Sequence, residues 1–295
     1  MGTRGSPLAL AQSGALVRDL IALTPGLEVE TVIIKTSGDL FSAAKPDAAE
    51  APAGGKGLFV KEIEEALSAG RVDFAVHSSK DLPAVLAPGL EIAAYPRRAD
   101  PRDVFIGKPG LSWTALGPGH KVGTASLRRR VQLLAARPGV ETVPMRGNVD
   151  TRLRKLSEGL CDGIILAAAG LERLGRSDVA REPVPVEVIL PSPGQGALAV
   201  EVRSDRAEIV KTISTLDDPR TRREVELERA FLSAVGGNCA TQLGAFARVA
   251  ADGSAVLEVF WSRPDGTGAT RLTDTCPAGG DPAAVASRLT AKLPR

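Results

Sequence analysis

A short polar run at residues 77–81 combines groups that can exchange protons and bind anions. His77, Lys80 and Asp81 follow the alternating apolar residues 72–76, and a proline soon afterwards ends any regular structure. The alternation predicts a buried strand, and α/β sheets bind their ligands at the carboxyl ends of such strands. A carboxylate at that position could transfer a proton or stabilise a cation. On spacing alone, a surface loop is an equally good interpretation.

Basic residues gather at the start of a helix predicted to follow residue 126. Ser126 is a typical N-cap, and Arg128, Arg129 and Arg130 fall in the first turn. The positive end of the helix dipole disfavours cations there by up to about 1 kcal/mol each, so we expect an anion to compensate them. The alternative is a solvated basic face, with Arg130 pointing to water. The expected buried face of this helix consists of Val131, Leu134 and Ala135.

The next strand, expected at residues 141–145, repeats this design. It carries Arg146 into a turn before a helix that contains Arg152. Two arginine clusters at equivalent ends of one sheet predict a binding surface for a polyanion. Arg4, just before the helix start at Ser6, could share such an anion or could simply be solvated.

The three cysteines, Cys161, Cys239 and Cys276, are odd in number and far apart. This argues against a disulfide framework and for a reducing compartment. Cys239 lies in a loop after Gly236 and Gly237 and before a predicted strand. A cysteine in such a place is more often structural than reactive. Cys161 is expected in the core, and Cys276 has no expected role.

The composition narrows the class of protein. The 295 residues are 43% hydrophobic and 24% charged, as in ordinary globular proteins, which excludes disordered and fibrous chains. No apolar run reaches membrane-spanning length and no leader pattern opens the chain, so a cytoplasmic protein without a membrane partner is expected. The aromatic content of 3% and the net charge of +2 argue against nucleic-acid binding, although the arginine clusters suggest it.

Three groups of elements have to position these side chains. Helix and strand patterns alternate up to residue 96 and again from about residue 121, which is typical of α/β units. Segments 95–103 and 190–197, rich in proline and glycine, are expected to cross between them. A small α+β module follows, with strands near 243–250, 255–262 and 269–275 and a last helix from Asp281. The expected domains are 1–96 plus 197–215, 100–191, and 217–295.

The first unit is predicted in more detail. We expect a helix that begins at Pro7, a strand at 29–36, a loop at 42–57 that could cover a site, and a helix near 58–67. Only three residues precede Arg4, whereas an average strand has about five. We therefore expect the first strand of this sheet to be incomplete.

A series of motifs runs through most of the chain in a fixed order. It reads TRGSPLALAQ, GGKGLFVKE, VDFAVHSSKDLP, DPRDVFI, VGTASLRRR, MRGNVDTRL, ILAAAGLERLG, LPSPGQGALAVE and GGNC. Together these motifs resemble the porphobilinogen deaminase (hydroxymethylbilane synthase) family. The resemblance implies two α/β domains similar to type II periplasmic binding proteins around a cleft, and a small C-terminal α+β domain.

The resemblance also implies an activity and a cofactor. Such enzymes are transferases of porphyrin and haem biosynthesis that condense four porphobilinogen molecules head to tail, release ammonia and form the linear tetrapyrrole hydroxymethylbilane. They are primed on a dipyrromethane held by a thioether bond, here to Cys239. A monomer without a metal is expected. The alternative is a two-domain protein that binds small anions without catalysis.

The resemblance assigns roles residue by residue. Asp81 is expected to be catalytic, because a carboxylate can stabilise the cationic pyrrole intermediates. The expected cofactor-binding residues are Cys239, Lys80, Asp81, Ser126, Arg128, Arg129, Arg146 and Gly147. The expected substrate-binding residues are Arg4, Ser6, Lys56, Phe59, Arg152, Arg173 and Gln195. His77 is a further position matched to the family near the cleft.

Overall fold

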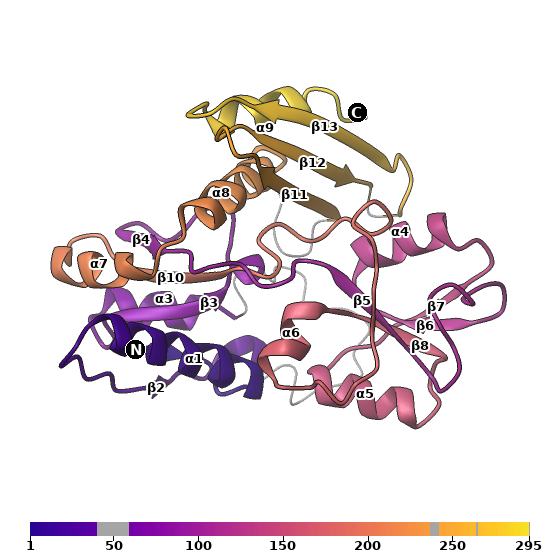
Figure 1. The fold of residues 1–295 in the computed structure, drawn as a ribbon, viewed down its shortest axis with the longest axis horizontal. Coiled ribbons are helices and arrows are strands. Elements are labelled where there is room, and N and C mark those ends of the chain that lie inside the picture. Colours follow the sequence, from indigo (N-terminus) through magenta and orange to yellow (C-terminus); the bar gives the residue numbers. More distant parts are fainter. Residues whose placement is uncertain (40–58, 237–241, 264, 295) are drawn as a thin grey trace.

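The computed structural model describes residues 1–39, 59–236, 242–263 and 265–294 of the chain. Figure 1 shows two five-stranded sheets along the long axis and a three-stranded sheet above their junction. The helices are α1 (Pro7–Leu23), α3 (Lys61–Ser68), α4 (Leu127–Ala136), α5 (Val149–Ser157), α6 (Ala168–Arg173), α7 (Ala207–Ile213), α8 (Pro219–Ala234) and α9 (Pro282–Thr290), with short 3-10 turns at Ser79–Asp81 and Ser214–Leu216.

The first sheet has the strand order β2-β1-β3-β10-β4, and we call it sheet A. Its strands are β1 (Gly2–Thr3), β2 (Val32–Ile33), β3 (Phe74–Ser78), β4 (Leu90–Ala94) and β10 (Leu198–Arg203). The first three run parallel, and β10 is antiparallel to both of its neighbours, β3 and β4. Leu16 and Leu20 of α1 pack with Phe74 and Val76 in the core on one face. On the other face, residues of α3 pack against Ala75.

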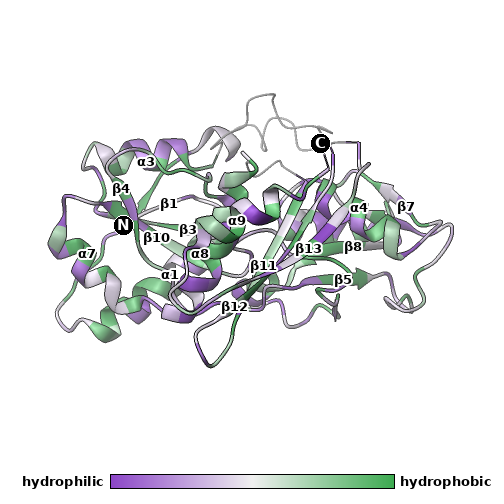
Figure 2. Cartoon of the chain, turned by 90° about the horizontal axis from the view of Figure 1, so that it is seen from above, coloured by the Kyte–Doolittle hydropathy of each residue, from purple (hydrophilic) through white to green (hydrophobic). Residues whose placement is uncertain are grey.

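The second sheet repeats this pattern in the order β7-β6-β8-β5-β9, and we call it sheet B. Its strands are β5 (Asp103–Gly107), β6 (Lys121–Gly123), β7 (Glu141–Val143), β8 (Gly163–Ala167) and β9 (Glu182–Pro183). Strands β6, β7 and β8 are parallel, and β5 is antiparallel to both β8 and β9. In Figure 2, β5 and β8 are largely apolar, whereas α1 and α3 carry both polar and apolar residues. Each sheet thus contains an antiparallel strand, β10 in sheet A and β5 in sheet B, that directly follows a crossing from the other sheet.

The third unit is a sheet of β11 (Leu243–Val249), β12 (Ala255–Trp261) and β13 (Thr270–Cys276). All its pairings are antiparallel, and α8 and α9 cover one face. Phe231 of α8 and Leu289 of α9 are fully buried against Leu257 and Val259. The architecture confirms the predicted class: two similar α/β units and a small C-terminal α+β unit.

One buried carboxylate joins the two crossings to the third unit. Glu228 of α8 accepts hydrogen bonds from both terminal nitrogens of Arg98, at 2.7 and 3.0 Å, in the first crossing. It also accepts from the amide of Gly194 in the second crossing, at 2.6 Å, and from the amide of Ala247 in β11, at 2.9 Å. Since Glu228 is completely buried, each of these contacts lies inside the protein.

Helices α1, α4 and α9 begin directly after the predicted caps Ser6, Ser126 and Asp281. Ser6, Ser126, Asn148 and Asp218 each accept a hydrogen bond from an amide of the following first turn, which satisfies a donor that the helix itself leaves free. The three strands of the C-terminal module are also confirmed. The predicted loop at 42–57 lies outside the described residues.

Two predictions about individual elements are wrong, and two strands were not predicted. The strand expected at 29–36 is limited to β2, whose residues are exposed. Strands β4 and β5 were not foreseen, because their segment is rich in proline and glycine. The buried face of α4 consists of Arg128, Arg129, Gln132 and Leu133 instead of Val131, Leu134 and Ala135.

The first strand does form, although it is short. Gly2 and Thr3 pair with Val32 and Ile33 of β2, and Gly2 also pairs with Ala75 of β3. Both residues of β1 are buried.

Candidate active site

A cavity opens at the carboxyl end of β3, beside the start of α1. Its lining includes Arg4, Ser6, Phe59, His77 and Asp81. Ser6 is also the N-cap of α1, where its hydroxyl accepts a hydrogen bond from the amide of Ala9. The structure therefore brings together side chains that lie far apart in the sequence. The strand end predicted to carry the chemistry does line a cavity.

Asp81 ends the 3-10 turn that follows β3. Within the described part of the chain, no side-chain hydrogen bond to its carboxylate is found, so its oxygens are available to a ligand in the cavity. Lys80 precedes it, and loss of hydration lowers the pKa of this lysine to about 8, with Arg129 and Arg128 contributing by repulsion. Asp81 and Asp103 act in the opposite direction. Lys80 therefore connects the β3 turn of sheet A electrostatically with the arginines of α4.

Arg4 is held on one side by a carboxylate and on one face by an aromatic ring. Its Nη2 donates to Oδ1 of Asp39 at 2.5 Å, and its Nε donates to Oδ2 at 3.3 Å. Its guanidinium carbon lies 4.1 Å from the centre of the Phe59 ring. Thr36 donates its hydroxyl hydrogen to Asp39 at 2.7 Å. Burial raises the pKa of Asp39, but the hydrogen bonds from Arg4 and Thr36 outweigh it and hold this pKa below its usual value.

His77, near the end of β3, pairs with a carboxylate of the neighbouring strand. Its Nε2 lies 3.0 Å from Oε2 of Glu201 in β10, and both side chains are buried. Glu64 of α3 is close enough for Glu201 to raise its pKa, after the larger effect of burial. This buried group fixes the end of β3 against β10 directly before the turn that carries Asp81.

Asp103, the first residue of β5, is the main site residue that sequence reasoning missed. Its fully buried carboxylate accepts hydrogen bonds from Arg128 at 2.9 Å and from Arg129 at 2.8 Å. The side-chain amide of Gln195 also donates to it, at 2.9 Å. The anion expected to compensate the arginines of α4 is thus, in part, supplied by the protein itself. The signal in the sequence was the motif DPRDVFI, which was noted without a role for this aspartate.

Arg128 and Gln195 have most of their hydrogen-bonding groups engaged inside the protein. Nη1 of Arg128 also donates to the carbonyl of Leu190 at 2.6 Å, and the amide of Gln195 also donates to the carbonyl of Pro101 at 2.7 Å. By contrast, Nε of Arg129 is buried without a partner among the described residues. Arg130 is exposed, as predicted for a side chain pointing to water. Arg128 and Arg129 are therefore buried and bound to protein acceptors, apart from Nε of Arg129, whereas Arg130 is exposed.

The turn after β7 supplies further cations. Gly147 has a φ of 115°, and a Cβ atom there would lie 2.7 Å from the side chain of Thr151, so only glycine fits this position. Its carbonyl accepts a hydrogen bond from Nε of Arg152 at 2.8 Å. Burial, together with repulsion from the neighbouring Arg129 and Arg146, lowers the pKa of Arg152 to about 10. Arg152 therefore lies near two other guanidinium groups, as expected for a surface that binds a polyanion.

The remaining predicted residues lie in several places. Ser126 caps α4, and Arg173 of α6 donates to the carbonyl of Gly196 in the second crossing at 2.6 Å. Burial lowers the pKa of Arg173. Lys56 and Cys239 lie outside the described residues. Cys161 and Cys276 are both buried.

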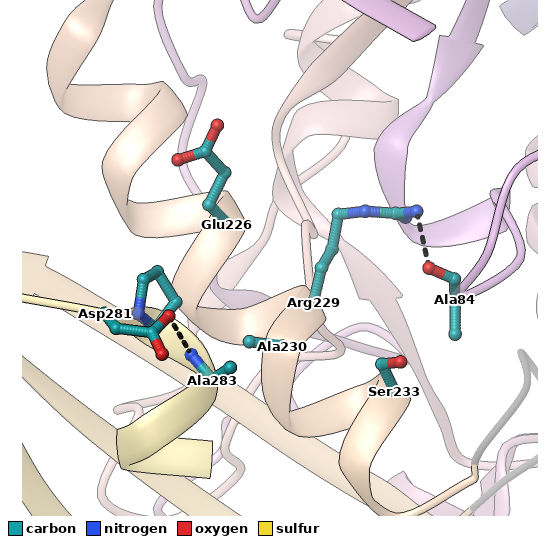
Figure 3. A pocket seen from close by; sticks show the side chains of 8 residues that line it. Ala84, Glu226, Arg229, Ala230, Ser233, Asp281 and Ala283 are labelled. Carbon is teal, nitrogen blue, oxygen red and sulfur yellow. Dashed lines mark hydrogen bonds between the residues drawn. The ribbon is translucent and has the colours of Figure 1, made fainter. Parts of the chain in front are cut away.

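A second cavity lies between α8, the start of α9 and the chain that follows Asp81. In Figure 3, the guanidinium group of Arg229 crosses from α8 towards Ala84. Its Nη2 donates to the carbonyls of Pro83 at 2.7 Å and Ala84 at 3.3 Å. The acidic side chains of Glu226 and Asp281 line the same cavity, which makes it a poor site for an anionic ligand. Arg229 instead connects α8 of the third unit to the segment that follows Asp81.

Two classes of function receive no support from the described residues. Within them, no group of three or more histidine, cysteine, aspartate or glutamate side chains could hold a metal ion. No helix among them is long and apolar enough to cross a membrane.

Two solved structures similar to this chain are distant from it. The periplasmic VFT2 domain of BvgS from Bordetella pertussis matches 70% of this chain and 76% of its own at 15% identity, with a TM-score of 0.39. The ligand-binding core of GluR0 from Nostoc punctiforme matches 69% of this chain and 83% of its own at 14% identity, with a TM-score of 0.36. Matches at this level carry no functional argument.

Comparisons of sequence are far closer. Residues 1–211 match the family model described as porphobilinogen deaminase, dipyromethane cofactor binding domain. The porphobilinogen deaminase of Syntrophus aciditrophicus is 49% identical over 252 residues, which cover 85% of this chain and 81% of the relative. That of Desulforudis audaxviator is 44% identical over 293 residues, covering 99% and 93%. With the site geometry described above, these matches show that the chain belongs to the porphobilinogen deaminase family.

Proposed function

We propose that this protein is a hydroxymethylbilane synthase, which joins four porphobilinogen molecules head to tail and releases ammonia at each step. Family membership supports a transferase that builds a tetrapyrrole on a dipyrromethane cofactor. The observation that carries the proposal is the charge of the site. Lys80, Arg128, Arg129, Arg146 and Arg152 are five cations linked by mutual electrostatic effects, and among the described residues the carboxylates of Asp81 and Asp103 lie with them.

This excess of cations fits the dipyrromethane cofactor. Each pyrrole unit carries two carboxylates, and guanidinium groups bind carboxylates with paired, charge-assisted hydrogen bonds. Nε of Arg129 is a buried donor without a partner among the described residues, and Arg152 is flanked by other cations. Both features favour a ligand with several negative charges. We propose that Lys80, Arg129, Arg146 and the Gly147 turn hold the cofactor, with its thioether bond at Cys239.

Asp81 is proposed to act on the reacting pyrrole. Loss of ammonia from porphobilinogen leaves a cationic intermediate, and formation of the carbon–carbon bond later releases a proton. A carboxylate at the cavity wall can stabilise the first and receive the second. Lys80, half-protonated near pH 8, lies beside it and can hold a substrate carboxylate or assist the proton transfer. On the side of sheet A, Arg4, Ser6 and Phe59 line the place for the incoming monomer.

The test is turnover of porphobilinogen by the purified protein. We expect release of one ammonia per monomer consumed and a product that closes and oxidises to a fluorescent uroporphyrin. Intact mass should exceed the sequence mass by two pyrrole units, and the protein should react with Ehrlich's reagent. Binding of porphobilinogen without ammonia release would instead favour a small-anion-binding protein, and would refute the proposal.

Three further assignments belong to this proposal. The functional division of the chain is into residues 1–96 plus 197–215, 100–191, and 217–295, with the last part carrying the cofactor cysteine. Arg173 and Gln195 are proposed to support substrate binding where the second crossing meets the site. The protein is proposed to act as a cytoplasmic monomer without nucleic acid, which size-exclusion chromatography with light scattering, and a salt titration against DNA, can test.

A further inference from the structure

Arg4 lines the part of the cavity proposed for the incoming monomer, and it already has an ion-pair partner. Arg4 uses its Nε and Nη2 edge to bind both oxygens of Asp39. We propose that Asp39 is a positioning residue that neutralises Arg4, so that Arg4 binds a substrate carboxylate exchangeably instead of tightly. The inference rests on the proposed function, because it concerns the carboxylates of the incoming monomer.

The geometry leaves a defined part of Arg4 for the ligand. With Nε and one side of Nη2 engaged by Asp39, and one face of the guanidinium group against Phe59, the remaining edge is formed by Nη1 and Nη2. That edge can make two parallel hydrogen bonds to a carboxylate. Thr36, which is completely buried, holds Asp39 in turn through its hydroxyl group. The orientation of Arg4 is therefore set before any ligand arrives.

The two sides of the site differ in their charge balance. Arg4 and Asp39 form a one-to-one pair whose side chains are 23% and 29% exposed. In the second α/β unit, repulsion from Arg129 and Arg146 lowers the pKa of Arg152, and no salt bridge of Arg152 is found among the described residues. A ligand carboxylate should therefore be held more tightly by Arg152 than by Arg4. A monomer has to leave its first position after each condensation, and a neutralised arginine lets its carboxylate go more easily.

The variant Asp39→Asn tests this directly. It keeps an oxygen that can accept from Arg4 but removes the charge, so we expect the KM for porphobilinogen to fall by about fivefold, as for loss of a partly exposed ion-pair partner. We expect kcat to fall as well, because release from the first position slows.

Asp205→Asn is the matched control. Asp205 binds Nε and Nη2 of Arg203 in the same side-on geometry, at 2.9 and 2.7 Å, at the end of β10 remote from the cavity. The KM and kcat of Asp205→Asn should equal those of the unaltered protein. An Asp39→Asn protein whose KM is unchanged or raised would overturn the proposal, because Asp39 would then only maintain the local structure.

A second measurement does not depend on turnover. Acetate, a bare carboxylate, can be titrated while the Nε–H resonance of Arg4, assigned with Arg4→Lys, is followed by NMR. We expect acetate to bind about fivefold more tightly to Asp39→Asn than to the unaltered protein. If neither protein converts porphobilinogen, the proposed function fails, but this titration still decides the role of Asp39. Equal acetate affinity in the two proteins would contradict it.

Discussion

Replacing Asp103 with asparagine should destabilise the protein strongly, although the change is nearly isosteric. The carboxylate is completely buried and is bound by Arg128 at 2.9 Å and Arg129 at 2.8 Å. Removing one partner of a buried ion pair costs about 3–5 kcal/mol, because the remaining charge stays buried without compensation. This is a large part of a typical stability of about 5–15 kcal/mol. We expect the melting temperature to fall by about 5–10 °C.

The effect has a defined dependence on pH. Burial raises the pKa of Asp103, but attraction to Arg128 and Arg129 outweighs it and holds the pKa well below the usual value. A carboxyl group whose pKa is lowered by folding stabilises the protein above its unfolded pKa, about 3.9, and this contribution is lost as the pH falls towards the folded pKa. The difference between the two proteins should therefore be full at neutral pH and shrink in strong acid.

The assay is thermal unfolding followed by circular dichroism, with and without the cofactor attached. The dipyrromethane cofactor carries four carboxylates, which should partly compensate the charges of Arg128 and Arg129 in Asp103→Asn. The decrease in melting temperature should therefore be smaller in the protein that carries the cofactor. Asp205→Asn, which removes an exposed carboxylate from a half-buried arginine, should change the melting temperature by no more than about 1 °C. A melting temperature for Asp103→Asn that matches this control would refute the reasoning that Asp103 supports the buried arginines.

Three other outcomes are expected. Asp81→Asn should fold and keep the cofactor while turnover, measured as uroporphyrin fluorescence, falls by about 10²-fold or more, and a rate near that of the unaltered protein would exclude a role in the chemistry. Cys239→Ser should have the mass of the bare chain and no turnover; cofactor found on it would place the thioether bond elsewhere. Uptake of the cofactor by cofactor-free protein should weaken as the pH rises through about 8, where Lys80 loses its charge. Lys80→Arg should remove this pH dependence. If the pH dependence of uptake is the same in Lys80→Arg as in the unaltered protein, Lys80 does not bind a carboxylate.

The parts of the fold that depend on local chemistry could be predicted. Ser6 followed by Pro7 places the start of α1, and Asp218 followed by Pro219 places that of α8, because capping and the fixed φ of proline act within one turn. The hydrophobic alternation of the C-terminal strands is equally local. Such signals need no knowledge of the rest of the chain.

Long-range electrostatics could not be read in the same way. The apolar period of α4 pointed to Val131 as buried, but the buried face carries Arg128 and Arg129 because Asp103, 25 and 26 residues away, compensates them. Likewise, the pairing of Arg4 with Asp39 spans 35 residues. Periodicity assigns arginine to solvent, so it fails where a distant carboxylate makes burial possible. The site itself was found from motifs of the family rather than from such patterns.

The position of Glu228 constrains how the molecule can deform. Its single carboxylate holds Arg98 in one crossing and Gly194 in the other, and it also holds the edge of the third sheet through Ala247. Because both connections between sheets A and B are fastened at this one point, the easiest relative movement is a rotation about it, and sliding would break buried hydrogen bonds. At Gly194, an added Cβ atom would lie 2.5 Å from Oγ of Ser79, so this pivot lies directly behind the turn that ends at Asp81. A growing product could then widen the space between sheets A and B far from the pivot. Asp81 lies close to the rotation axis, so it would keep its position relative to each new bond.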